Sequence, residues 1–218
     1  MKALFASNLI KYFELIAGIT GIICYYKRPK TIWFAFALYL IALFCMEFYG
    51  AWLGNIRMYV QNTHLYKWIV VPSLFIMYHF VFYAIINNPK KRLVLAGALL
   101  FTLIAGLENI FWNAEHFYTI SLSISVGCLL ILTYTFIYLF QLMKSTDILG
   151  FTEQPAFWFC IALLIFYLGC FPYLTFFNSM SIAKNKNIYD LYRWGFIILN
   201  YLMYGLFIIA FLCNKQKS

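Results

Sequence analysis

Residues 31–54 have the sequence TIWFAFALYLIALFCMEFYGAWLG, and this stretch decides the fold. Its only charged residue is Glu47, which lies among Phe, Tyr, Met and Leu. At a rise of about 1.5 Å per residue, roughly 20 helical residues cross the hydrocarbon core of a bilayer. The stretch is therefore predicted to form a transmembrane helix that carries a carboxylate within the span.

The whole chain is as apolar in composition as a membrane protein. Of its 218 residues, 65% are hydrophobic and only 11% are charged, whereas soluble domains carry roughly 25% charged residues. A soluble core of this size could not bury so much apolar surface, so we expect an integral membrane protein whose main partner is the lipid bilayer. Nucleic acid is not an expected partner, because no basic run exceeds three residues.

The hydropathy pattern predicts an all-α polytopic membrane protein, with residues 1–218 forming one seven-helix transmembrane domain. Short polar breaks such as "NNPKKR" separate the apolar segments, and Pro29, Pro89 and Pro155 fall at predicted helix starts, where a missing N–H is harmless. The predicted spans are approximately 3–26, 31–54, 66–88, 92–113, 117–143, 156–179 and 190–213.

The distribution of lysine and arginine predicts the orientation. The dense clusters Lys27–Lys30 and Lys90–Arg92 both lie in short loops that follow odd-numbered crossings, the first and the third, counted from an external N-terminus. Short loops rich in Lys and Arg stay on the cytoplasmic side. We therefore expect the N-terminus outside and the C-terminus in the cytoplasm, in a cell inner membrane.

Three glutamates lie inside the predicted spans: Glu14, Glu47 and Glu108. A charge at the middle of a bilayer costs roughly 2.5–3.5 kcal/mol on insertion scales, so such residues normally face the bundle interior or water. Counted along the helices, Glu47 and Glu108 lie roughly 8–10 Å below the outer surface, and Glu14 lies roughly 15 Å below it. All three are predicted to occupy the outer half of the bundle.

Helical periodicity places each glutamate beside small or aromatic residues. Glu47 shares a face with Gly50 and Gly54, a small-xxx-small pattern that lets helices approach closely. The residues that share a face with the other two glutamates are Ala17, Gly18 and Gly21 for Glu14, and Ala105 and Trp112 for Glu108. The three carboxylates are therefore expected to point toward neighbouring helices and to line one outward-facing acidic pocket.

Other polar residues are predicted to join this pocket. Asn109 follows Glu108, and Asn200 and Tyr204 stack on one face of the last helix. The complete set of predicted ligand-binding residues is Glu14, Glu47, Glu108, Asn109, Trp112, Asn200 and Tyr204. The alternative is that each glutamate is neutral or hydrogen-bonded and only fixes the packing of the helices.

Known catalytic and metal-binding patterns are missing from the sequence. Its three histidines and two aspartates do not supply the intramembrane ligands of a seven-helix zinc hydrolase, and the six cysteines form no CxxC pair. The last helix has no interior lysine for a retinal Schiff base, and no GxSxG, HExxH or phosphate loop is present. No cofactor and no metal are expected, and no catalytic residue is assigned.

At "YFELIAGITG" (12–21), "MEFYGAWLG" (46–54), "FWFCIALLIFYLGCFPY" (157–173) and "NIYDLYRWGFIILNYLMYGLFIIAF" (187–211), the chain resembles a group of small, uncharacterised seven-helix bacterial integral membrane proteins. The resemblance covers most of the chain and is most distinctive in the last two helices. It implies a bacterial inner-membrane protein in which Glu14 and Glu47 are recurring features. It implies no activity.

We expect the protein to bind or sense a small ligand, cationic or amphiphilic, and to signal through a partner protein, because the predicted inner loops are too short to form an effector domain. One alternative is an intramembrane enzyme in which two glutamates act as general acid and base on a lipid. Another is a small transporter subunit, which the missing internal repeat disfavours. A purely structural assembly subunit is a further alternative.

Overall fold

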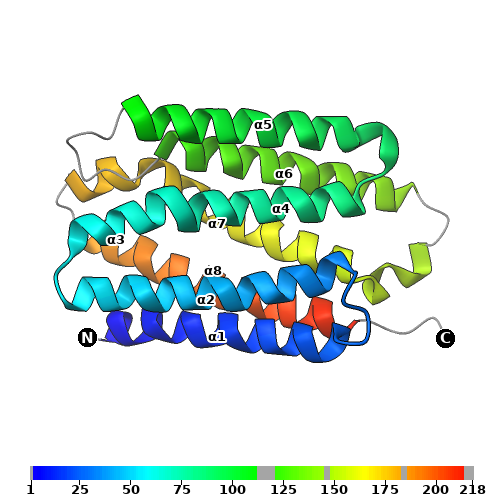
Figure 1. Ribbon diagram of the computed structural model, residues 1–218, viewed down its shortest axis with the longest axis horizontal. Helices are drawn as coiled ribbons and strands as arrows, with labels where there is room; N and C mark the ends of the chain where they lie inside the picture. Colours follow the sequence, from blue (N-terminus) through cyan, green and yellow to red (C-terminus); the bar gives the residue numbers. More distant parts are fainter. Residues whose placement is uncertain (1, 112–120, 145–147, 183–185, 214–218) are drawn as a thin grey trace.

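The computed structural model describes residues 2–111, 121–144, 148–182 and 186–213. Within these residues the protein is helical and contains no strand. Seven long helices lie side by side in an antiparallel bundle (Figure 1), the third of which is continuous through α3, η1 and α4. The elements are α1 (Lys2–Tyr25), α2 (Ile32–Asn55), α3 (Tyr59–Leu65), η1 (Tyr66–Val70), α4 (Val71–Ile85), α5 (Asn88–Phe111), α6 (Ser121–Met143), η2 (Ile148–Glu153), α7 (Pro155–Ile182) and α8 (Lys186–Leu212).

Neighbours in the sequence are also neighbours in the bundle. Helix α1 packs against α2 and α8, α4 packs against α2 and α5, and α6 packs against α5 and α7. Contact between α7 and α8 completes a closed ring of helices. The start of α1 and the end of α8 lie at opposite ends of the bundle, as Figure 1 shows.

The outer surface of the bundle is suited to lipid. Five helices among the described residues are long and apolar enough to cross a membrane: Ile32–Asn55, Tyr59–Ile85, Asn88–Phe111, Leu122–Met143 and Leu191–Leu212. Large apolar side chains are widely exposed on them, including Phe48 at 63% and Leu99 at 71%. Exposure on this scale is unfavourable in water and normal in hydrocarbon. The chain is therefore a helical membrane protein.

The loop predicted between the second and third spans is mostly helical. Arg57 has a positive φ of 63°, and this left-handed residue ends α2 while Met58 N donates to Leu53 O at 2.9 Å. The chain thus reverses within three residues, and the polar sequence YVQNTHL forms α3. The predicted start of this helix at residue 66 is wrong because a tight turn needs far fewer residues than the polar stretch contains.

A π-helical turn, η1, joins α3 to α4. Pro72 lies just beyond it, within the first turn of α4. Proline has no N–H to donate, and its ring clashes with the carbonyl four residues earlier, so a regular α-helix cannot continue through this point. A π-turn widens the helix locally and relieves that clash, and such turns are frequent at functional sites.

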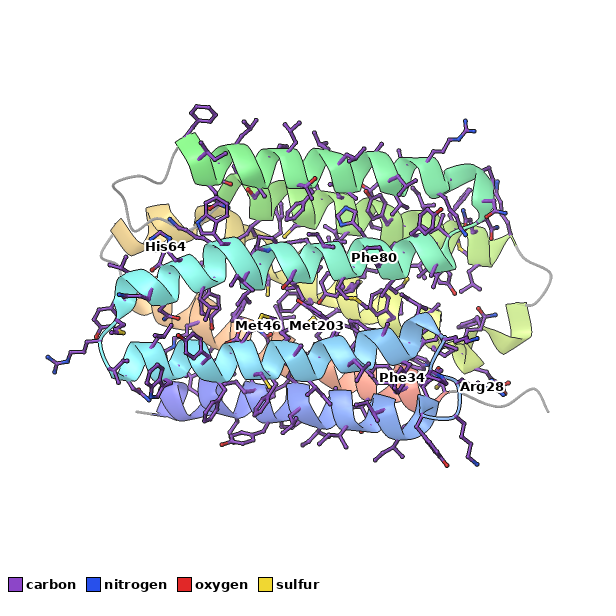
Figure 2. The ribbon with its side chains drawn as sticks, in the orientation of Figure 1. Arg28, Phe34, Met46, His64, Phe80 and Met203 are labelled. Atoms are coloured by element: carbon purple, nitrogen blue, oxygen red, sulfur yellow. The ribbon has the colours of Figure 1, made fainter. Side chains whose placement is uncertain are left out.

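Figure 2 distinguishes the two ends of the bundle. Arg28 and Phe34 lie at one end, which we name the Arg28 end, and His64 lies at the other, which we name the His64 end. Between them, aromatic rings fill the core: Phe36 meets Phe159 edge-on at 5.3 Å and Phe207 at 5.1 Å. These three rings are fully buried and hold α2, α7 and α8 together.

Candidate functional site

Glu14 is buried in the bundle, on the face of α1 that meets α2. Only 1% of the residue is exposed, and no described residue donates a hydrogen bond to its Oε1 atom. The neighbouring Gly18 permits this burial, because a Cβ there would lie 3.2 Å from the carbonyl oxygen of Ala37. The prediction that Glu14 faces a closely packed neighbour through small residues is confirmed.

Glu47 faces the following helix, as its glycine-containing face predicts. The Tyr66 hydroxyl donates to Glu47 Oε2 at 2.6 Å. A Cβ added to Gly50 would lie 3.0 Å from both Asn62 Oδ1 and Tyr66 Cε2, so α2 approaches α3 and η1 closely at this point. The absence of a side chain at Gly50 therefore lets the Tyr66 ring lie against α2 and reach the carboxylate.

Glu14 and Glu47 form one site. Their carboxyl groups are close enough to interact electrostatically, and Lys11 interacts with both. The hydroxyl of Tyr204, a buried residue on α8, lies within electrostatic range of the same two carboxylates. We name Lys11, Glu14, Glu47, Tyr66 and Tyr204 the paired-carboxylate site. Two ionised carboxylates in one buried place repel each other, so this site favours a bound proton or cation.

Glu108 has a different role, because it caps the start of α6. Its Oε1 accepts from Leu122 N at 3.1 Å, and its Oε2 accepts from Ser123 N at 2.7 Å and from the Ser123 hydroxyl. The first N–H groups of a helix have no partner within the helix, and a carboxylate there also meets the positive end of the helix dipole. Both oxygens are thus engaged in structure, which removes support for an acid–base pair of Glu47 with Glu108.

Asn109 and Lys67 extend this second cluster. Lys67 is 5% exposed and interacts electrostatically with Glu108. The Asn109 side chain donates from Nδ2 to the backbone carbonyl of Lys67 at 3.3 Å, which ties α5 to η1. We name Lys67, Glu108, Asn109 and Ser123 the capped-carboxylate cluster. The two clusters thus differ in hydrogen bonding and adjoin through the consecutive residues Tyr66 and Lys67 of η1. The single acidic pocket expected from the sequence stays a prediction.

The other residues predicted to line the pocket are Asn200, Tyr204 and Trp112. Asn200 is buried, but its Nδ2 donates to the carbonyl of Phe196 at 2.8 Å within its own helix. Tyr204 belongs to the paired-carboxylate site, as described above. Trp112 lies outside the described residues.

Sequence reasoning missed Tyr66 and Lys67 as site residues. Both belong to η1, where Tyr66 reaches α2 and the carbonyl of Lys67 accepts from α5. One signal was available, namely Pro72 in the first turns of an apolar helix, which indicates a local deformation. The direction in which that deformation turns each side chain depends on neighbouring helices and cannot be obtained from the pattern.

Metal-binding chemistry has no support within the described residues. There, no group of three or more His, Cys, Asp or Glu side chains lies close enough to hold a metal ion. The six cysteines are free, and three of them, Cys128, Cys160 and Cys170, are buried. Burial in apolar surroundings is typical of structural cysteines.

Comparison of the chain with family models, with curated proteins and with solved structures finds no match. The site is therefore interpreted from its own geometry. The resemblance to small seven-helix bacterial membrane proteins stays a prediction.

Proposed function

We propose that this is a seven-span bacterial inner-membrane protein that binds a small cationic ligand, which can be amphiphilic, at the paired-carboxylate site and signals through a partner protein. One observation carries the proposal. Glu14 Oε1 is buried without a hydrogen-bond donor among the described residues, and a second carboxylate, that of Glu47, lies nearby. Buried polar atoms are nearly always paired, so an orphaned carboxylate oxygen indicates a missing partner.

An organic ammonium group fits this site chemically. Its positive charge would relieve the repulsion between the two carboxylates, and an N–H group would supply the missing hydrogen bond to Glu14. Tyrosine rings add a favourable surface, because cations bind over aromatic faces. Tyr66 and Tyr204 come from two different elements, η1 and α8, so ligand binding would couple the positions of these helices.

The proposed orientation places the paired-carboxylate site on the outer side of the membrane. Support comes from Lys27–Lys30, in the short connection between α1 and α2 at the Arg28 end, and from Lys90–Arg92, in the first turn of α5. The connection between α4 and α5 has only two residues outside the helices, 86 and 87. So short a connection cannot carry an effector domain, and a signal would therefore pass to a separate protein.

Equilibrium binding to the purified protein tests this proposal. The protein in a nonionic detergent would be titrated with methylammonium and with dodecylammonium, both of which carry N–H groups, and binding would be followed by calorimetry. We expect saturable binding of at least one probe at one site. Glu14→Gln and Glu47→Gln should each weaken binding by at least tenfold, because each removes one of the two charges that the cation neutralises.

Glu108→Gln is the matched control, since it removes the same charge from the capped-carboxylate cluster. Its affinity should stay within about threefold of the wild-type value. Equal losses of affinity in all three variants would indicate that the probe responds to the overall charge of the protein, and they would contradict a localised site. Absence of saturable binding by either probe to a folded wild-type protein would contradict the proposed ligand class.

A further inference from the structure

A cleft lies at the Arg28 end, opposite the paired-carboxylate site. It encloses about 460 Å³ between the start of α2, the end of α4, the end of α6 and the start of α7. This volume is within the usual range of about 300–1,000 Å³ for small-molecule sites. The cleft takes no part in the proposed function, and its lining residues are distant in sequence from both carboxylate clusters.

The polar lining of this cleft is rich in hydrogen-bond donors. Gln141 accepts a hydrogen bond at its Oε1 from the backbone N of Asn87 at 3.3 Å. Gln154 accepts one at its Oε1 from the Tyr138 hydroxyl, also at 3.3 Å. Each glutamine oxygen already accepts one of these hydrogen bonds, and each glutamine also has an NH₂ group that can donate to a ligand. A cleft lined by donors favours an anion.

Basic residues adjoin the lining of the same cleft along the chain. Asn87 lies at its rim, and Lys90 N donates to the Asn87 carbonyl at 3.0 Å, so the first turn of α5 adjoins the cleft. That turn carries three cations, at residues 90–92, and no acidic residue. Cations near a helix start oppose the helix dipole. A bound anion would offset this unfavourable placement.

Two further basic segments adjoin the cleft. Thr31, whose hydroxyl donates to Arg28 O at 2.9 Å, connects the segment 27–30 to Trp33 at the start of α2, and Trp33 lines the cleft. Lys144 follows the cleft residues at the end of α6. Within the described residues, the acidic side chain nearest in sequence to the cleft lining is the exposed Glu153, which directly precedes Gln154 and is outnumbered by the cations of the basic segments. The electrostatic field at the cleft therefore favours negative charge.

Several features favour a lipid over a soluble anion. The cleft also has apolar walls, which include Trp33 and Leu142. Beside it, Lys91 Nζ lies 5.0 Å above the ring of Tyr83, and Lys144 Nζ lies 4.5 Å above the ring of Phe140. Both rings are exposed on the outer surface of the bundle. Lysines that extend over such rings are typical of the boundary between hydrocarbon and headgroups.

From this arrangement we infer that the cleft binds the phosphate headgroup of an anionic phospholipid. The phosphate oxygens accept from the amide groups of Gln141 and Gln154, and the cations in the first turn of α5, which include Lys90 and Arg92, supply positive charge near the cleft. The acyl chains lie along the apolar surface beside α4 and α6. Basic pockets between transmembrane helices are suited to such headgroups.

The test compares lipids in nanodiscs that contain the full-length protein. Thermal unfolding would be measured in phosphatidylcholine alone and with increasing fractions of phosphatidylglycerol, for the wild type, for Lys90→Gln/Arg92→Gln and for Arg57→Gln. Arg57 is exposed beyond the end of α2, at the end of the bundle away from the cleft. We expect phosphatidylglycerol to stabilise the wild type and Arg57→Gln at similar fractions. The double variant should need roughly thirtyfold more of it, from two lost charges near the membrane surface.

A variant in the cleft lining distinguishes binding in the cleft from general attraction between the cations and anionic lipid. Gln141→Leu keeps every cation and should also lose most of the preference for phosphatidylglycerol, with stability in phosphatidylcholine measured as the reference. Full preference in Gln141→Leu, or equal losses in Arg57→Gln and the double variant, would overturn the inference. Inorganic phosphate or glycerol phosphate added to phosphatidylcholine nanodiscs should give no comparable stabilisation. Equal protection by either one would overturn the assignment to lipid.

Discussion

Glu14 and Glu108 are both glutamates in the same bundle, and they differ in burial, in hydrogen bonding and in the charges nearby. Both oxygens of Glu108 accept hydrogen bonds from the start of α6. Glu14 is 1% exposed, has an oxygen without a donor among the described residues, and faces a second carboxylate. An acid whose oxygens are satisfied stabilises the fold, whereas a buried acid with an oxygen that lacks a donor lowers stability, and we propose that Glu14 binds a ligand.

The largest effect on stability is expected at the capped-carboxylate cluster. Glu108→Ala removes the acceptor of the Leu122 and Ser123 backbone N–H groups and leaves them unpaired at the start of α6. We expect a loss of about 2–3 kcal/mol in the free energy of unfolding, because hydrogen bonds to a charged group and a helix cap are lost together. Denaturant titration in mixed micelles measures this loss.

Leu107→Ala provides the control for that measurement. Leu107 is the preceding residue of α5 and is 46% exposed on the outside of the bundle. Its truncation should cost less than 1 kcal/mol, since little packing is lost at an exposed position. Equal losses in the two variants would remove the structural role assigned to Glu108.

A smaller effect is expected at the contact between Tyr66 and Glu47. Tyr66→Phe keeps the ring beside Gly50 and removes only the hydroxyl that donates to Glu47 Oε2 at 2.6 Å. The unfolding free energy should fall by about 1–2 kcal/mol, the usual cost of losing a hydrogen bond to a charged or buried group. Tyr59→Phe, at a position that is 58% exposed on α3, should be nearly neutral. A neutral Tyr66→Phe would mean that the hydroxyl does not support Glu47.

Much of the fold follows from hydropathy, and part of the site follows from helical periodicity. Apolar length predicts the long helices, and the spacing of Glu47, Gly50 and Gly54 correctly predicts a close contact on that face. The rise per residue also gives the position of a residue along its own helix. Together these rules give the position of a residue along its helix and the face of that helix on which the residue lies.

The grouping of the three glutamates could not be obtained in this way. Their similar depths suggested one pocket, but a depth does not say where a residue lies around the bundle axis. That angle depends on which helices are neighbours, and here α1 contacts α2 and α8 whereas α5 contacts α4 and α6. Glu14 therefore meets Glu47 on α2, and Glu108 meets the start of α6. The π-turn that directs Tyr66 arises from Pro72 together with packing against α2 and α5, which no local pattern contains.

The most direct test of the account compares the stability of Glu14→Gln and Glu108→Gln side by side, with and without dodecylammonium. Without the probe, Glu14→Gln should equal or exceed the wild type in unfolding free energy, by up to about 1 kcal/mol, because a neutral amide replaces a buried carboxylate that lacks a hydrogen bond at one oxygen and lies near a second carboxylate. Glu108→Gln should be less stable than the wild type. With the probe, the wild type and Glu108→Gln should be stabilised and Glu14→Gln should not. A Glu14→Gln protein that is destabilised as much as Glu108→Gln, yet is still stabilised by the probe, would contradict the account.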